Sequence, residues 1–116
     1  MPQFANRAEG LRFRIVLKPG FALGPGKADL LEAIGRTASL TAAAAGLGMS
    51  YKRSWILVRE MNAAFSEPLV ETEKGGTGGG GAARLTPLGR KVLARYRSMQ
   101  HDAEHAIADG EAVAIP

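Results

Sequence analysis

Residues 49–62 read MSYKRSWILVREMN, and this stretch decides the fold. Ser50 is a typical helix N-cap, Lys52 and Arg53 put two cations into the first helical turn, and apolar residues then recur at three- and four-residue steps. A short alanine-rich segment, 39–45, precedes this stretch across a turn rich in glycine. This order is typical of a helix-turn-helix, whose second helix enters the DNA major groove. The sequence therefore predicts a recognition helix that Ser50 caps.

The segments around this motif predict the rest of a winged fold. Alternating apolar and basic residues over 11–17 predict a strand with one solvated face, and a Pro-Gly pair ends it. A Gly-Pro-Gly loop then leads into a helix predicted over 27–37. Residues 68–74 and 83–86 predict the strands of a hairpin with a glycine-rich tip. A long helix is expected to follow, capped by Thr86 and with proline at its first position.

The order strand, three helices, hairpin and long helix predicts an α+β fold that is mainly α, a winged helix-turn-helix. We expect residues 11–86 to form that domain, 86–108 a C-terminal dimerisation helix and 109–116 a flexible tail. The long helix carries a heptad-like apolar stripe, which the same helix of a second chain would cover. The alternative is packing of the stripe along its own domain. The expected dimer contacts are Leu88, Val92, Tyr96 and Met99.

Composition limits the class of protein. The 116 residues suffice for one small domain with an extension. The absence of cysteine excludes disulfides and thiolate chemistry. No apolar run approaches the roughly 20 residues that a membrane helix needs. We therefore expect a cytoplasmic, nucleoid-associated protein with no membrane contact.

Charge is unevenly distributed along the chain. All 15 Lys and Arg lie in residues 1–99 beside 7 acids, a balance of +8, whereas residues 100–116 hold four acids and no Lys or Arg. A basic body suits a polyanionic partner, because neutralised phosphates release their counterions. Many small basic proteins bind no nucleic acid, so charge by itself decides nothing. It adds weight to the helix-turn-helix.

The predicted recognition helix has an inner and an outer stripe. The inner stripe, which we expect to pack against the other helices, holds Ser54, Val58, Met61 and Phe65. Lys52 and Arg53 run against the usual preference for acids at a helix start. Cations there are favourable if phosphates or guanine edges approach that end. The alternative is a solvated charged face. Two interpretations of Trp55 stay open: it contacts DNA, or it packs under the wing or at a subunit contact.

The glycine hairpin does not have the spacing of a phosphate-binding loop, because no Lys follows its glycines and strands rather than a helix flank it. It predicts a wing, with Lys74 and Arg84 beside the tip at phosphate-contact positions; a merely flexible loop is the alternative.

His101 and His105 have the spacing of a metal pair, but no third ligand motif accompanies them, and we interpret them as solvated. No nucleophile motif is present either. We therefore expect no enzyme, no cofactor and no metal site.

Several motifs, spread over roughly residues 12–105, resemble the N-terminal DNA-binding domain of the ModE family of bacterial molybdate-responsive regulators. These motifs are Ser39-Leu-Thr, Ala43-Ala44, Gly48-Met-Ser-Tyr-Lys52, Trp55, Met61-Asn62, Pro68-Leu-Val-Glu71, the glycine run and Leu85-Thr86-x-x-Gly89. More distantly they are similar to the winged helix of LysR-type regulators. The resemblance implies a homodimeric repressor or activator on a palindromic operator in double-stranded DNA. By matching position, it implies DNA contacts from Ser39, Thr41, Ser50, Tyr51, Lys52, Arg53, Arg59, Lys74 and Arg84.

Two departures from the family pattern matter. Family members often carry a Lys in the glycine run, where this sequence has Thr77. The family's molybdate-binding domain has no room before Pro116, which implies either a naturally single-domain member or a shortened chain. Molybdate is therefore not expected to bind this chain alone, and an oxyanion sensor is the remote alternative. The hypothesis is a sequence-specific DNA-binding transcription regulator tied to molybdenum genes; the rival is a winged-helix module for protein–protein contact.

Overall fold

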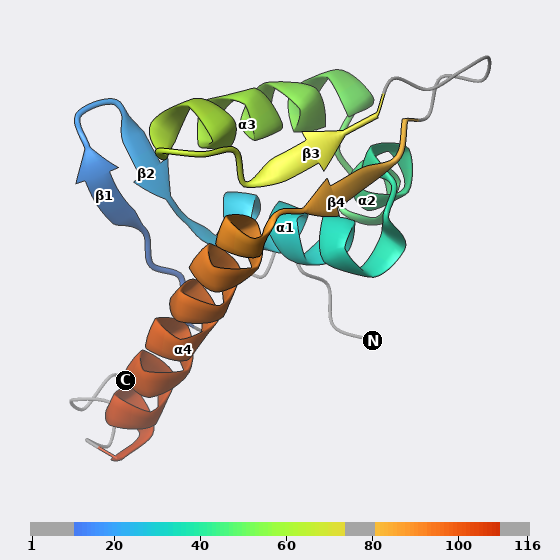
Figure 1. Ribbon diagram of the computed structural model, residues 1–116. Helices are drawn as coiled ribbons and strands as arrows, with labels where there is room; N and C mark the ends of the chain where they lie inside the picture. Colours follow the sequence, from blue (N-terminus) through green and yellow to red (C-terminus); the bar gives the residue numbers. More distant parts are fainter. Residues whose placement is uncertain (1–10, 74–80, 110–116) are drawn as a thin grey trace.

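The computed structural model describes residues 11–73 and 81–109 of the chain. Three helices lie together at the centre, a short hairpin flanks them on each side, and a long helix leaves the body (Figure 1). This is the predicted winged helix-turn-helix, mainly α. The elements are β1 (Ile15–Lys18), β2 (Phe21–Leu23), α1 (Pro25–Thr37), α2 (Leu40–Gly46), α3 (Tyr51–Ala64), β3 (Val70–Thr72), β4 (Ala83–Leu85) and α4 (Pro87–Asp109).

The N-terminal segment is a hairpin rather than the single strand expected over 11–17. Strand β1 begins only at Ile15, and the chain turns at Gly20, with φ +87°, into antiparallel β2. Strand β2 was missed because three residues are too short for an alternation to be read. Helix α1 also begins earlier than expected, at Pro25, because proline fits the first helical position.

The three central helices bury a shared apolar core. Leu30 and Leu31 of α1 and Met61 of α3 are fully buried, and Leu69 from the base of the wing joins them. The buried alanines of α2 let that helix approach its neighbours closely. Both helices of the helix-turn-helix are capped by a serine side chain, α2 by Ser39 and α3 by Ser50, the latter as predicted. The inner stripe of α3 is thus held in the core, which leaves its opposite face to solvent.

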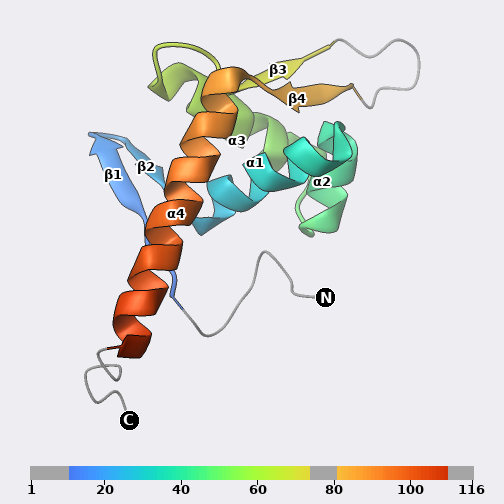
Figure 2. The same ribbon diagram turned by 60° about the horizontal axis from the view of Figure 1, so that its bottom comes forward.

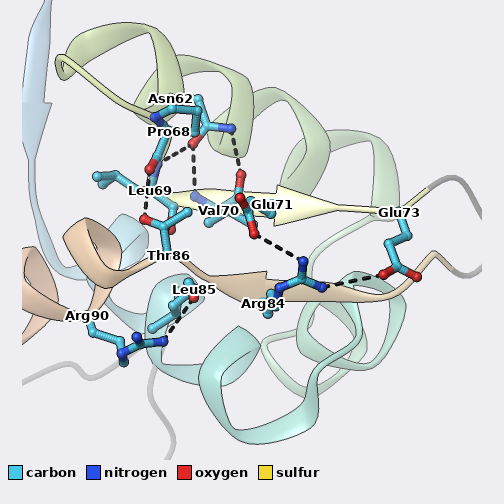
Figure 3. A network of polar contacts seen from close by, with 10 residues as sticks. All are labelled: Asn62, Pro68, Leu69, Val70, Glu71, Glu73, Arg84, Leu85, Thr86 and Arg90. Carbon is cyan, nitrogen blue, oxygen red and sulfur yellow. Dashed lines mark hydrogen bonds and ion pairs between the residues drawn. The ribbon is translucent and has the colours of Figure 1, made fainter.

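The second hairpin, β3–β4, is fastened to α3 by one amide side chain (Figure 3). Asn62 Oδ1 accepts hydrogen bonds from the backbone N–H of Leu69 at 2.8 Å and of Val70 at 3.1 Å. Its Nδ2 donates to the carbonyl of Val70 at 3.0 Å. Asn62 therefore fixes the base of the wing against the C-terminal half of α3.

The base of the wing is also joined to α4. The Thr86 hydroxyl donates to the carbonyl of Pro68 at 2.8 Å (Figure 3). It also accepts from the N–H of Gly89 at 2.9 Å, so Thr86 caps α4 as predicted. A Cβ on Gly89 would overlap the carbonyl oxygen of Leu69. The motifs Met61-Asn62 and Leu85-Thr86-x-x-Gly89 are therefore structural, since they lock α3, the wing and α4 together.

Helix α4 is anchored through its middle and then extends beyond the body (Figure 2). The Tyr96 ring stacks on Phe13 with centroids 4.8 Å apart, and its hydroxyl donates to the Phe13 carbonyl at 2.7 Å. Tyr96 is fully buried in its own domain. Its expected role as a dimer contact is therefore wrong in this arrangement, because the periodic stripe does not distinguish packing on the same chain from packing on another.

An ion-pair cluster next to Tyr96 ties α4 to α1. Arg97 donates to Asp29 Oδ1 at 2.8 Å and to Glu32 Oε1 at 2.9 Å. Burial raises the pKa of Asp29 above its ordinary value, and the hydrogen bond from Arg97 opposes this shift. The cluster compensates a carboxylate that would otherwise be buried at high cost.

Among residues 11–73 and 81–109, no helix combines the length and the apolar character that a membrane crossing requires.

Candidate nucleic-acid interface

Helix α3 lies between the two hairpins of the molecule (Figure 1). Asn62 holds it to β3 on one side, and Phe65 at its end meets Phe21 of β2 edge-on, with centroids 5.9 Å apart. The buried stripe of Ser54, Val58 and Met61 faces the core. The remaining face of α3 is presented to solvent with a hairpin on either flank.

The outward face of α3 carries both charged and apolar side chains. Lys52, Ile56 and Arg59, at i, i+4 and i+7, share one side of the helix, and all three are exposed. Ile56 is 44% exposed and presents an aliphatic side chain beside the two cations. Cations suit guanine edges and phosphates, and an aliphatic side chain suits a thymine methyl group. Ile56 was not among the expected contacts, although its spacing from Lys52 would have indicated it.

The first turn of α3 concentrates cations at a helix N-terminus. Ser50 Oγ accepts from the N–H of Arg53 at 3.0 Å and thereby fixes where the helix starts. Within the part of the chain that the structure describes, the side chains of Lys52 and Arg53 make no hydrogen bond or ion pair. The partial positive charge of the helix N-terminus adds to theirs. This end of α3 is therefore electrostatically suited to an anion.

The aromatic residues of α3 lie on its wing side. Trp55 is 42% exposed, and the Arg59 guanidinium lies 5.3 Å from the centre of its ring. Tyr51 is also exposed. Trp55 is thus not packed under the described part of the wing, and its stacking orients Arg59 on the outer surface.

The start of α2 lies beside the end of the β3–β4 hairpin that is nearer the wing tip. Ser39 forms a bridge with Ala82, and its Oγ accepts from the N–H of Ala42 at 3.0 Å. Thr41, in the first turn of the helix, is exposed. A hydroxyl that accepts a capping bond still has its proton to donate, so Ser39 and Ser50 remain able to bind a phosphate oxygen.

The described part of the wing is less basic than expected. Arg84 is paired with Glu71 at 3.2 Å and with Glu73 at 3.4 Å, so its charge is already compensated (Figure 3). Glu71 lies directly opposite Arg84 in the register of the hairpin. Lys74 and the glycine tip with Thr77 lie outside the described residues. The wing strands as described thus offer a phosphate no free cation.

The two histidines of α4 lie next to each other. The rings of His101 and His105 have centroids 4.3 Å apart. Over residues 11–73 and 81–109, no group of three or more His, Cys, Asp or Glu side chains is arranged to hold a metal ion.

These features define a winged helix-turn-helix domain of the DNA-binding type, with α3 as the second helix of the motif. The sequence model of the bacterial regulatory helix-turn-helix proteins, lysR family, matches residues 27–90. The chain belongs to this family.

Known relatives narrow the type of domain. The chain is 42% identical over 86 residues to the molybdenum-pterin-binding protein MopB of Rhodobacter capsulatus, across 74% of this chain and 32% of MopB. It is 40% identical over 88 residues to the molybdenum transport protein ModE of Azotobacter vinelandii, across 76% of this chain and 32% of that protein. It is 34% identical over 94 residues to the DNA-binding transcriptional dual regulator ModE of Escherichia coli K12, across 78% of this chain and 36% of that protein. The domain is of the ModE type, and the chain spans about a third of the length of these curated relatives.

Proposed function

We propose that the protein is a sequence-specific DNA-binding transcription regulator that acts as a homodimer on a palindromic operator. The observation that carries this proposal is the outer face of α3, where Lys52, Arg53 and Arg59 are exposed around an apolar Ile56. This mixture of cations and aliphatic surface fits base edges and phosphates together. The MopB and ModE relatives support a role in molybdenum metabolism, by control of genes for molybdate uptake or use.

The binding test begins with the protein's own genomic DNA. Sequencing of the fragments that the purified protein retains identifies its binding sites, and a fluorescent duplex from the strongest site then serves as the probe. We expect tight binding that weakens steeply with salt, because phosphate contacts release counterions. The double substitution Lys52→Ala/Arg53→Ala should cost about 1–3 kcal/mol of binding free energy for each specific base interaction that it removes.

A matched control removes two cations elsewhere. Lys91 and Arg95 are exposed on α4, away from α3, and Lys91→Ala/Arg95→Ala changes the net charge by the same amount. The recognition assignment is refuted if both pairs weaken binding equally. Sequence-independent weak binding at physiological salt would favour the rival, a winged-helix module for protein contact.

The dimer is proposed to form through the distal part of α4. Of the expected contacts, Leu88 and Val92 are partly buried against their own core, whereas Met99 is 38% exposed. Ile107, two turns further on, is also 38% exposed and extends the same kind of surface. A second copy of α4 would cover both side chains.

The oligomeric state tests this surface. Met99→Glu/Ile107→Glu should convert a dimer to a monomer in sedimentation equilibrium. It should also weaken operator binding, because each protein domain then binds its half-site independently. Ser98→Glu, an added charge on the neighbouring exposed position, is the control. A wild-type protein that sediments as a monomer at tens of micromolar would refute the dimer.

A further inference from the structure

A pocket of about 480 Å³ lies beside α3 on the flank away from the wing. The β1–β2 hairpin, the start of α1 and one side of α3 form its walls. Arg53 contributes to the pocket, and Asn62, nine residues along α3, holds the wing. Nine residues are about two and a half helical turns, so the two side chains lie on opposite flanks. The pocket is thus separate from the wing, and it shares Arg53 with the exposed first turn of α3.

The pocket collects cations from three different segments of the chain. Arg14 precedes β1, Lys27 lies in the first turn of α1 and Arg53 lies in the first turn of α3, and no carboxylate is among the lining residues. Over the described part of the chain, the side chains of Arg14 and Arg53 make no hydrogen bond or ion pair. Like charges gathered around one cavity repel each other, and an anion between them removes this cost.

Lys27 is held in place rather than neutralised. Its Nζ lies 5.1 Å from the centre of the Phe21 ring, which forms part of the pocket wall. The carboxylate of Glu60 is 4.0 Å away, beyond ordinary hydrogen-bonding range, and its side chain is half exposed. A water-screened pair of this kind contributes little, so Lys27 remains available to a stronger anion.

The backbone at the start of α1 is open toward the same pocket. Helix α1 has no side-chain cap and no acid in its first turn. Gly24 and Gly26 line the pocket, and a Cβ on Gly26 would meet nothing within 4 Å. The amides of Gly26 and Lys27 precede the first backbone hydrogen bond of the helix, which runs from Ala28 to Gly24. Free amides at a helix N-terminus favour an anion as the side chains do.

We propose that this pocket receives a backbone phosphate of the DNA, so that the β1–β2 hairpin acts as a second wing. The inference rests on the proposed function and adds a contact to it. Arg53 belongs both to the pocket and to the first turn of α3, so a recognition helix in the groove brings the pocket to the groove's edge. The major groove is about 12 Å wide, and the flanks of a helix that fills it lie beside the bordering phosphates. The occupant is therefore a phosphate of a strand rather than a free oxyanion.

The first test places a negative charge in the pocket without disturbing the fold. Gly26→Asp adds a carboxylate where a Cβ meets nothing, and an acid in the first turn of a helix stabilises it. We expect the thermal midpoint to stay level or rise while the affinity for the operator duplex falls at least tenfold. Comparison with Gly26→Ala separates the effect of charge from that of bulk. Binding by Gly26→Asp as tight as by Gly26→Ala overturns the proposal.

The second test removes a cation and measures the dependence on salt. Arg14→Gln should weaken binding to the operator and to an unrelated duplex by the same factor, and should lower the slope of log K against log salt by about 1. Arg95→Gln on α4 is the charge-matched control and should leave the slope unchanged. An unchanged slope for Arg14→Gln also overturns the proposal.

The third test separates a phosphate on DNA from a free oxyanion. The thermal midpoint of the wild type and of Arg14→Gln is measured with sodium phosphate, sulfate and molybdate against sodium chloride of equal ionic strength. Stabilisation of the wild type alone by a free oxyanion, with operator affinity equal in both proteins, identifies a small-anion site and refutes the DNA contact. If the wild type binds no DNA at all, the proposed function fails as well. If the wild type binds DNA and the pocket variants bind it equally tightly, this inference alone fails.

Discussion

Replacing Asn62 by alanine should partly detach the wing from α3 and lower the stability of the whole domain. The side chain makes three hydrogen bonds, two of them to the N–H groups of Leu69 and Val70, residues that are 0% and 2% exposed. Each buried donor left without a partner costs about 1–3 kcal/mol, so two of them cost about 2–6 kcal/mol. A small domain is stable by only about 5–15 kcal/mol, and this loss is therefore a large fraction of the total.

The assay is urea unfolding followed by circular dichroism, together with hydrogen exchange of the amides of Leu69 and Val70. In a thermal melt followed by the same signal, Asn62→Ala should lower the midpoint by roughly 10–50 °C, at about 4–8 °C per kcal/mol for a domain of this size. The two amides should exchange much faster than those in the core of α1.

Asn62→Asp provides a graded control. It keeps an oxygen that accepts from both N–H groups, but it loses the donor to the carbonyl of Val70 and sets a negative charge against it. Its cost should be intermediate, about 1–2 kcal/mol, and should shrink as the pH falls and the carboxyl group regains a proton to donate. The reasoning is refuted if Asn62→Ala unfolds within about 0.5 kcal/mol of the wild type, the range of ordinary surface substitutions, with both amides still protected.

Two further substitutions test the anchoring of α4. Helix propensity alone predicts that Gly89→Ala stabilises the protein by about 1 kcal/mol, but the overlap with the Leu69 carbonyl predicts a loss of about 1–3 kcal/mol instead, and a higher urea midpoint would contradict the contact. Arg97→Met leaves Asp29 buried without its counter-charge and should cost about 3 kcal/mol at pH 7. The pKa of Asp29 is already raised above 3.8 and rises further without Arg97, so the folded state then binds the proton more tightly than the unfolded state. Stability should accordingly recover as the pH falls from 7 through that raised pKa toward 3.8, and urea unfolding that shows the same deficit at all pH values would argue against this account.

The features that the sequence predicted well are local ones. Ser39 and Ser50 cap the helices that follow them because a cap needs only the next three residues. The buried stripe of α3 follows from helical periodicity in the same way. The family match supports the motifs on which the resemblance was based.

The features that were missed depend on contacts between distant segments. Tyr96 packs on Phe13, 83 residues earlier, and periodicity alone does not say which surface an apolar stripe meets. Strand β2 exists because the chain turns back at Gly20, and three residues carry too little pattern to predict it. The pairing of Arg84 with Glu71 follows from the hairpin register. It could have been predicted, since the two residues lie on the two predicted strands. The pocket that Arg14, Lys27 and Arg53 line could not be predicted, because only the three-dimensional fold brings these three segments together.

The rigid base of α4 has a consequence for how two such domains would share one operator. Thr86, Gly89 and Tyr96 fix the helix at several points along its first half, which leaves no hinge between it and the recognition helix. If the distal halves of α4 from two chains pair, the length and direction of α4 set the separation of the two α3 helices. Half-sites are read one helical turn of DNA apart, about 34–36 Å, or at multiples of this. Operator spacing in this protein would then depend on α4, and a one-turn insertion in α4 would change which palindromes the dimer binds while leaving the residues of α3 unchanged.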